Sequence, residues 1–117
     1  MIPARYDFTI YQGQTLQKVL TLKNESGDAI DLNGYSGRLM ARVDKASDTT
    51  VITSEGDSAN ITVTVDDSDG TITLLMTAVQ TAALDFNLAF WDLEIYDATH
   101  VYRLYEGIIT LSKEVTR

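Results

Sequence analysis

Two stretches near the end of the chain alternate between apolar and polar residues, with a short polar segment between them. They span residues 88–96 and 101–111. Alternation with a period of two is typical of a half-buried β-strand, so this pattern predicts a β-hairpin. Pairing Tyr96 with Val101 gives the hairpin one continuous apolar face, because a one-residue slip would expose the apolar set. The residues predicted on that core-facing side are Trp91, Leu93, Ile95, Tyr102, Leu104 and Ile108.

The opposite side of this hairpin combines aromatic and charged residues. Its predicted members are Phe90, Asp92, Glu94, Tyr96, Arg103 and Tyr105. In this register Leu93 lies opposite Leu104, and Glu94 lies opposite Arg103. The second pair predicts a cross-strand ion pair worth about 0.2–1 kcal/mol. Arg103 is also expected to keep Asp92 and Glu94 ionised, without the separated pKa values that acid–base catalysis needs.

A second hairpin is predicted over residues 61–76. The apolar positions of its two halves face each other only if Asp66 pairs with Thr71, which leaves residues 67–70 as a four-residue loop. Directly after it, Thr77 and Gln80 have the spacing of a helix capping box. The sequence therefore predicts one short helix near residues 78–83.

The first half of the chain contains further short strand patterns. Residues 5–11 alternate cleanly, residues 15–23 alternate except at Val19, where a bulge is predicted, and residues 35–43 carry Gly37 at an inward position. A glycine there indicates close approach of another strand or a bend. Residues 51–53 predict a short edge strand.

The whole pattern amounts to about seven or eight short strands with turn signals between them. Turns at intervals of roughly 8–12 residues are typical of β-sandwiches. We therefore expect an all-β fold, a single antiparallel β-sandwich domain over residues 1–117, immunoglobulin-like or jelly-roll-like, with one short helix. The chain is long enough to bury a core without a disulfide or a metal.

Composition narrows the classes of function. The formal net charge is −8, which disfavours nucleic acid and anionic membrane surfaces as partners. Cysteine is absent, so disulfides and thiolate metal sites are excluded. No apolar run approaches the roughly 20 residues of a membrane-spanning helix, and the N-terminus lacks the pattern of a signal peptide. We expect synthesis in the cytoplasm and no membrane partner.

Candidate chemistry is sparse. The acidic run from Asp66 to Gly70 departs from the EF-hand spacing and is interpreted as a hairpin turn. His100 is the only histidine, which excludes a two-histidine metal site, and its place in a hairpin loop predicts a solvated ring. The Gly-x-Ser-x-Gly pattern of a nucleophile elbow is missing. We therefore predict no catalytic residues, no metal ligands, no cofactor and no enzymatic activity.

Phe90, Tyr96 and Tyr105 leave three interpretations open. Another strand of the sandwich could cover them, they could anchor a protein interface, or they could stack on sugar rings. The sequence does not decide among the three. The candidate partner-binding set is the whole aromatic and charged side, Phe90, Asp92, Glu94, Tyr96, Arg103 and Tyr105.

Taken in order, the turn, cap and strand motifs resemble the small β-sandwich structural proteins of tailed bacteriophages, and are similar to the N-terminal module of phage baseplate upper proteins. The resemblance covers nearly the full chain through these segments: Tyr11–Leu16, Ile30–Tyr35, Leu39–Arg42, Gly70–Leu74, Thr77–Leu84, Trp91–Ile95, Arg103–Gly107 and Glu114–Arg117.

The resemblance implies a non-enzymatic virion structural protein, such as a capsid decoration, a neck or collar piece, or a tail adaptor. Its implied partners are other phage structural proteins, namely capsid, connector, tail or fibre, and it is expected to form a symmetric homo-oligomer in the particle. Because the sequence ends directly after the last strand, a stand-alone module is expected. The segment Met1 to Arg5 is expected to become ordered on assembly. The alternative is a carbohydrate-binding or host-surface-binding module on the particle.

Overall fold

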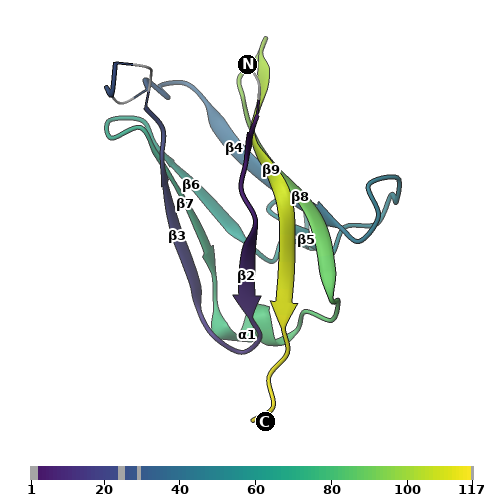
Figure 1. Ribbon diagram of the computed structural model, residues 1–117. Coiled ribbons are helices and arrows are strands. Elements are labelled where there is room, and N and C mark those ends of the chain that lie inside the picture. The colour runs from purple at the N-terminus through teal and green to yellow at the C-terminus, as the bar shows by residue number, and fades with distance from the viewer. Residues whose placement is uncertain (1–2, 24–25, 29, 117) are drawn as a thin grey trace.

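The computed structural model describes residues 3–23, 26–28 and 30–116, and within them the chain forms nine strands and one short helix (Figure 1). In chain order these are β1 Ala4–Arg5, β2 Phe8–Tyr11, β3 Leu16–Thr21, β4 Ser36–Arg42, β5 Ile52–Thr53, β6 Thr62–Asp66, β7 Thr71–Met76, α1 Ala78–Ala82, β8 Leu88–Tyr96 and β9 Val101–Ser112. The domain is mostly β, and its two open sheets are consistent with the predicted sandwich.

The two sheets lie face to face as layers, with the core between them (Figure 1). The large sheet has the order β1-β9-β8-β4-β5, and β2 also pairs with β9; the small sheet has the order β3-β7-β6. Both β1 and β2 run parallel to β9, whereas the other pairs are antiparallel. The large sheet is therefore mixed, and the prediction of a purely antiparallel fold is wrong for the N-terminal strands.

The predicted N-terminal strand is split at Tyr6 and Asp7, for a reason found in β9. A Cβ at Gly107 would collide with the Tyr6 carbonyl oxygen, so only glycine admits the chain this close. The Trp91 indole Nε1 donates a 2.9 Å hydrogen bond to that same oxygen, and the Ile108 backbone N donates to the Asp7 carboxylate at 2.8 Å. Side chains thus replace ladder bonds where the strand bends.

The C-terminal hairpin confirms the predicted register near its turn and departs from it further on. Tyr96 pairs with Val101 and Glu94 faces Arg103, as predicted, but the register shifts by one residue next to Leu93, whose partner is Tyr105. The prediction that Leu93 faces Leu104 is therefore wrong. A single extra residue, as in a β-bulge, changes the faces of all residues after it.

Two face assignments change with this shift. Tyr105 lies on the core side with Leu93 rather than on the outer side, and Ile108 lies opposite Phe90 on the outer side, whereas Ile109 is buried in its place. Trp91 is a core residue as predicted, with 3% of its surface exposed.

The second hairpin and the helix are confirmed. Asp66 pairs with Thr71, and Gly70 closes the turn with a φ of 65°. Thr77 Oγ1 accepts a 3.1 Å hydrogen bond from the backbone N of Gln80, and the Gln80 side chain accepts one from Thr77 N at 2.9 Å.

Two predictions for the first half have opposite outcomes. Gly37 does mark close approach, because a Cβ there would lie 2.9 Å from the Val63 side chain of the facing sheet. The bulge predicted at Val19 is wrong, since β3 pairs with β7 in continuous register. Val19 points outward with 57% of its surface exposed, and Lys18 points inward, 5.3 Å from the centre of the Phe8 ring.

Candidate functional site

The outer side of the large sheet carries most of the predicted site residues. Its side chains stand in rows across β4, β8 and β9, because these strands are neighbours in register. One row is Arg42–Phe90–Ile108, the next is Met40–Asp92–Glu106, and the third is Arg38–Glu94–Arg103. Arg5 of β1 lies beside Glu106, and Lys45 lies in the loop after β4. We call this surface the charged face: Arg5, Arg38, Arg42, Lys45, Phe90, Asp92, Glu94, Arg103 and Glu106.

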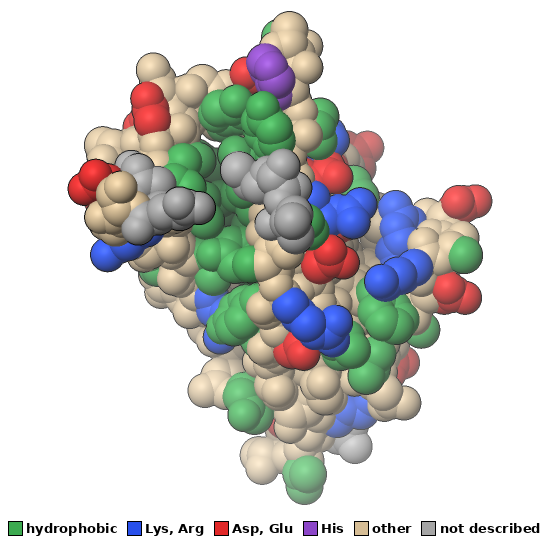
Figure 2. All heavy atoms as spheres, turned by 45° about the horizontal axis from the view of Figure 1, so that its top comes forward, with side chains coloured by type: hydrophobic (Ala, Val, Ile, Leu, Met, Phe, Trp, Pro, Cys, Tyr) green, Lys and Arg blue, Asp and Glu red, His purple; other side chains and the backbone are tan. Residues whose placement is uncertain are grey.

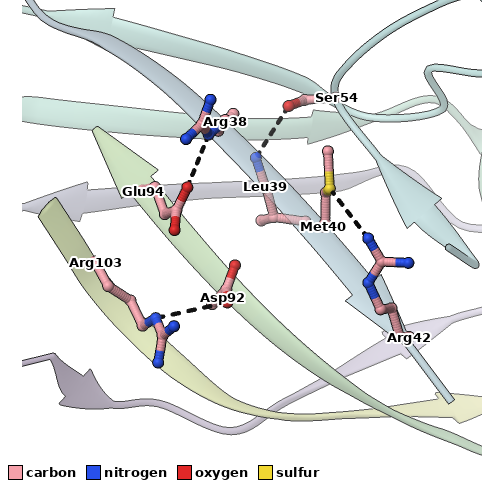
Figure 3. A network of polar contacts seen from close by, with 8 residues as sticks. All are labelled: Arg38, Leu39, Met40, Arg42, Ser54, Asp92, Glu94 and Arg103. Atoms are coloured by element: carbon pink, nitrogen blue, oxygen red, sulfur yellow. Dashed lines mark hydrogen bonds and ion pairs between the residues drawn. The ribbon is translucent and has the colours of Figure 1, made fainter. Parts of the chain in front are cut away.

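Ion pairs cross the charged face, but not in the predicted combination (Figure 3). Glu94 Oε1 binds Arg38 Nε at 2.8 Å, and Arg103 Nε reaches diagonally to Asp92 Oδ2 at 3.6 Å. The predicted pair of Glu94 with Arg103 is therefore wrong. Glu94 has a neighbour on each side of its strand, and the sequence pattern showed only β9, not the Arg38 that β4 places opposite it.

The expectation that Arg103 prevents a rise in the pKa of Asp92 is also wrong. Partial burial raises the pKa of Asp92, and the carboxylates of Glu94 and Glu106 raise it further, whereas Arg103 and Arg42 lower it. Asp92 and Glu106 are direct cross-strand partners, an arrangement that places like charges side by side. The centre of the charged face therefore holds excess negative charge between flanking cations.

A hollow of about 370 Å³ opens on the charged face. Arg42, Lys45, Phe90 and Asp92 line it, together with Arg5 and Glu106. The loop that follows β4 projects away from the sheet (Figure 1) and contributes Lys45 to the hollow, and Arg42 Nη1 holds this loop by a 3.0 Å hydrogen bond to the Ser47 carbonyl. Arg42 Nη2 also lies 3.8 Å from the Met40 sulfur (Figure 3).

The three aromatic residues of the predicted site are divided between the two sides of the sheet. Phe90 and Tyr96 lie outside, where Lys45 Nζ sits 5.3 Å from the Phe90 ring centre and Arg38 sits 4.6 Å from that of Tyr96. Tyr105 lies inside, stacked on Trp91 with ring centres 6.5 Å apart, and burial raises its pKa. Tyr105 thus packs with the core and is not part of the charged face.

The charge of the face is opposite in sign to that of the chain. Its five cations and three carboxylates give +2, while the other four cations and fourteen carboxylates give the rest of the chain −10. Figure 2 shows Lys and Arg side chains next to Asp and Glu side chains on the right half of that view. More than half of the cations are therefore gathered on one surface of an acidic molecule.

The sequence pattern did not predict Glu106, which the register shift moves to the outer side of β9, nor the members of this face that lie outside the C-terminal hairpin. Arg38 and Arg42 occupy alternate, outward-facing positions of β4, which the sequence pattern indicates. That β4 lies beside β8 was not predicted. Lys45 and Arg5 come from a loop and from the separate strand β1, so no local pattern identifies them.

The other candidate residues lie away from this face. His100 is exposed in the β8–β9 loop, where its Nδ1 lies 2.8 Å from Thr99 Oγ1 and 3.4 Å from Asp97 Oδ1. Among residues 3–23, 26–28 and 30–116, no group of three or more His, Cys, Asp or Glu side chains is placed to hold a metal ion. In that same part of the chain, no helix has the length and apolar character needed to cross a membrane.

Comparison with known proteins gives no assignment: no family model matches the chain, and no curated protein is significantly similar to it.

Proposed function

We propose that this domain is a non-enzymatic structural protein of a tailed bacteriophage particle that docks onto symmetric particle components through its charged face. The observation that carries the proposal is the gathering of five cations on one face of an otherwise acidic domain, four of which line the hollow there. The resemblance of the strand and turn motifs to phage sandwich proteins supports the location in a virion. The number of copies of the chain in each particle would indicate where in the particle the domain lies.

The finer fold that we propose is immunoglobulin-like rather than jelly-roll-like. The small sheet order β3-β7-β6 matches the B-E-D strands of such a domain, and β4-β8-β9 match C-F-G. The split strand formed by β1 and β2 takes the place of strand A, moved to the edge beside β9. This arrangement leaves the C-F-G sheet, and with it the charged face, open on its outer side.

Docking is favoured over sugar binding by the state of the outer aromatic rings. Arg38 lies over the Tyr96 ring and Lys45 lies over the Phe90 ring, so a sugar stacking on either covered face would displace a cation. Mixed charge around a hollow instead suits a protein partner, because complementary charges set register and speed encounter. Docking could instead use the exposed strand edges or the N-terminal segment. Met1 and Ile2 of that segment lie outside the described residues.

The proposal is tested first by purifying intact particles from infected cells and identifying their proteins by mass spectrometry with copy counting. We expect the chain to be present at a fixed stoichiometry that reflects the particle symmetry. Few copies indicate the neck or tail, and many indicate the capsid. Absence from purified particles, together with stabilisation of the free protein by defined oligosaccharides, would favour the carbohydrate-binding alternative.

A further inference from the structure

The β6–β7 turn presents a dense acidic group on the opposite layer of the molecule. Asp66 Oδ1 accepts hydrogen bonds from the backbone N of Ser68 at 3.1 Å, from Ser68 Oγ at 2.8 Å and from the backbone N of Asp69 at 3.3 Å. These bonds lower the pKa of Asp66 and tie its carboxylate to the backbone of the turn. Asp67 and Asp69 are exposed, and neither forms an ion pair within the described residues. The turn therefore presents two exposed carboxylates that have no ion-pair partner among the described residues.

The charged face holds two cations that match this turn. Arg42 donates to a carbonyl oxygen and to a sulfur, and Lys45 lies over the Phe90 ring. In the part of the chain that the structure describes, neither side chain forms an ion pair with a carboxylate. Both line the hollow, beside Phe90. An incoming carboxylate would therefore find two cations without having to break an existing ion pair.

We propose that the β6–β7 turn of one copy binds in the hollow of a second copy, with Asp67 and Asp69 against Arg42 and Lys45. The turn belongs to the small sheet, which forms the other layer (Figure 1), and the hollow opens on the outer side of the large sheet. A chain therefore cannot fill its own hollow. The contact joins two different surfaces, and contacts of this kind build closed rings or open chains of subunits.

Asp85, Asp97 and Asp44 fit this role less well, because each already contacts another group of the chain. Asp85 pairs with Lys113 at 3.5 Å, and Asp97 lies beside His100. Asp44 is already bound to the backbone of its own loop, the loop that carries Lys45. The β6–β7 turn combines three aspartates in four residues with no cation among them.

The effect of ionic strength on association distinguishes this contact from the overall repulsion between two acidic chains. At about 0.1 M salt the screening length is roughly 10 Å, and at about 1 M it is roughly 3 Å. The molecule measures 45 × 28 × 26 Å, so at the lower salt most charges of two touching copies are screened from one another. The oppositely charged side chains that meet in the hollow are too close together to be screened at this salt concentration. Association is therefore expected at the lower salt and lost at the higher.

The test is sedimentation velocity of the full chain over a range of concentrations. At about 0.1 M salt we expect the average mass to rise with concentration above the 12.9 kDa of one chain, and to return to that value near 1 M salt. Reversing either surface, with Arg42→Glu/Lys45→Glu or with Asp67→Lys/Asp69→Lys, is expected to leave each variant monomeric.

An equimolar mixture of the two reversed variants is expected to associate again, because each turn then meets a face of opposite charge. Lys23→Glu/Lys113→Glu changes the formal charge as the first variant does, but away from the hollow, and should associate as the unchanged chain does. If the unchanged chain stays monomeric at all concentrations, the inference is overturned. The same holds if the mixture of the two reversed variants stays monomeric. Incorporation into particles separates this contact from the proposed docking, because the Asp67→Lys/Asp69→Lys chain keeps the charged face intact. Normal incorporation of that chain, with loss of Arg42→Glu/Lys45→Glu, assigns the loss to docking rather than to self-association.

Discussion

Trp91 stabilises the centre of the fold through two kinds of contact. Its ring packs edge-on against Phe8 with centres 5.2 Å apart and stacks on Tyr105, while its Nε1 satisfies the Tyr6 carbonyl. The side chain thus joins β8 to the N-terminal strands and to β9. Its place in the core was predictable from alternation alone, but the hydrogen bond was not, because it joins residues 85 positions apart.

The first prediction is that Trp91→Ala lowers the free energy of unfolding by about 3–5 kcal/mol. The reasons are a cavity between the two sheets and a carbonyl left without its donor. Urea unfolding of the two proteins measures the difference. A loss below about 1 kcal/mol, the size typical of an ordinary surface substitution, would show that the core is not centred here.

The second prediction concerns the pH dependence that Asp92 contributes. Because the folded chain raises the pKa of Asp92, it binds more protons than the unfolded chain just above the ordinary aspartate range. The stability of the protein relative to Asp92→Asn should therefore fall as pH rises through that range. The measurement is urea unfolding of both chains at a series of pH values.

Asp66 provides a control of opposite sign, since hydrogen bonds from Ser68 and Asp69 lower its pKa. Stability relative to Asp66→Asn should be fully present above the ordinary aspartate pKa and should be lost as pH falls through the folded value. Parallel pH trends for the two comparisons would contradict the assigned environments.

At the scale of elements, the strands β1 and β2 depend on one missing side chain. Gly107 of β9 lets the chain approach at Tyr6, whereas Gly37 of β4 lets the two sheets approach near Val63. Both glycines mark close packing, but the first meets rigid backbone and the second meets a side chain that can move. Substitution of each glycine should therefore destabilise a different part of the structure.

The third prediction is that Gly107→Ala destabilises the domain by about 1–3 kcal/mol or more and releases the N-terminal strands. Amide hydrogen exchange should rise at residues 6–11. Gly37→Ala is the matched control, and its effect should centre on β4 and β6 instead. Unchanged exchange in β2 of the Gly107→Ala protein would show that the glycine is not what admits the strand.

The fourth prediction is that millimolar calcium leaves the melting temperature unchanged. A bound ion would stabilise the folded state by mass action. In the β6–β7 turn, however, Asp66 Oδ1 already accepts three hydrogen bonds from Ser68 and Asp69. A calcium-dependent rise that Asp67→Ala abolishes would instead establish a cation site in this turn.

The elements also show which features of a sandwich can be predicted from its sequence. The β6–β7 hairpin was predictable because its apolar residues match in only one register and Gly70 closes its turn. In β8–β9 the same reasoning failed beyond Glu94, because one extra residue leaves no mark in the alternation of either strand. Parallel pairing of β2 with β9 joins the two ends of the chain and has no local signal.

At the scale of the whole molecule, the main feature is the uneven distribution of charge. The charged face carries +2 in a chain of −8. Four of its nine residues, Phe90, Asp92, Glu94 and Arg103, could be predicted from the sequence, whereas Glu106 of β9 joins them through the register shift. The rest depends on β4 lying beside β8, on β1 lying beside β9, and on Arg42 holding the loop of Lys45 in place. Tertiary structure, rather than any motif, brings these cations together.

The most direct test of the docking face is the number of copies incorporated into purified particles when the chain carries Arg42→Glu and Lys45→Glu. The Lys23→Glu/Lys113→Glu chain is the control of equal charge, and urea unfolding must show both variants folded. We predict at least about a tenfold loss of the first variant from particles, equivalent to about 1.4 kcal/mol, and normal incorporation of the second. Equal incorporation of both would contradict this prediction and would move docking to the strand edges or to the N-terminal segment.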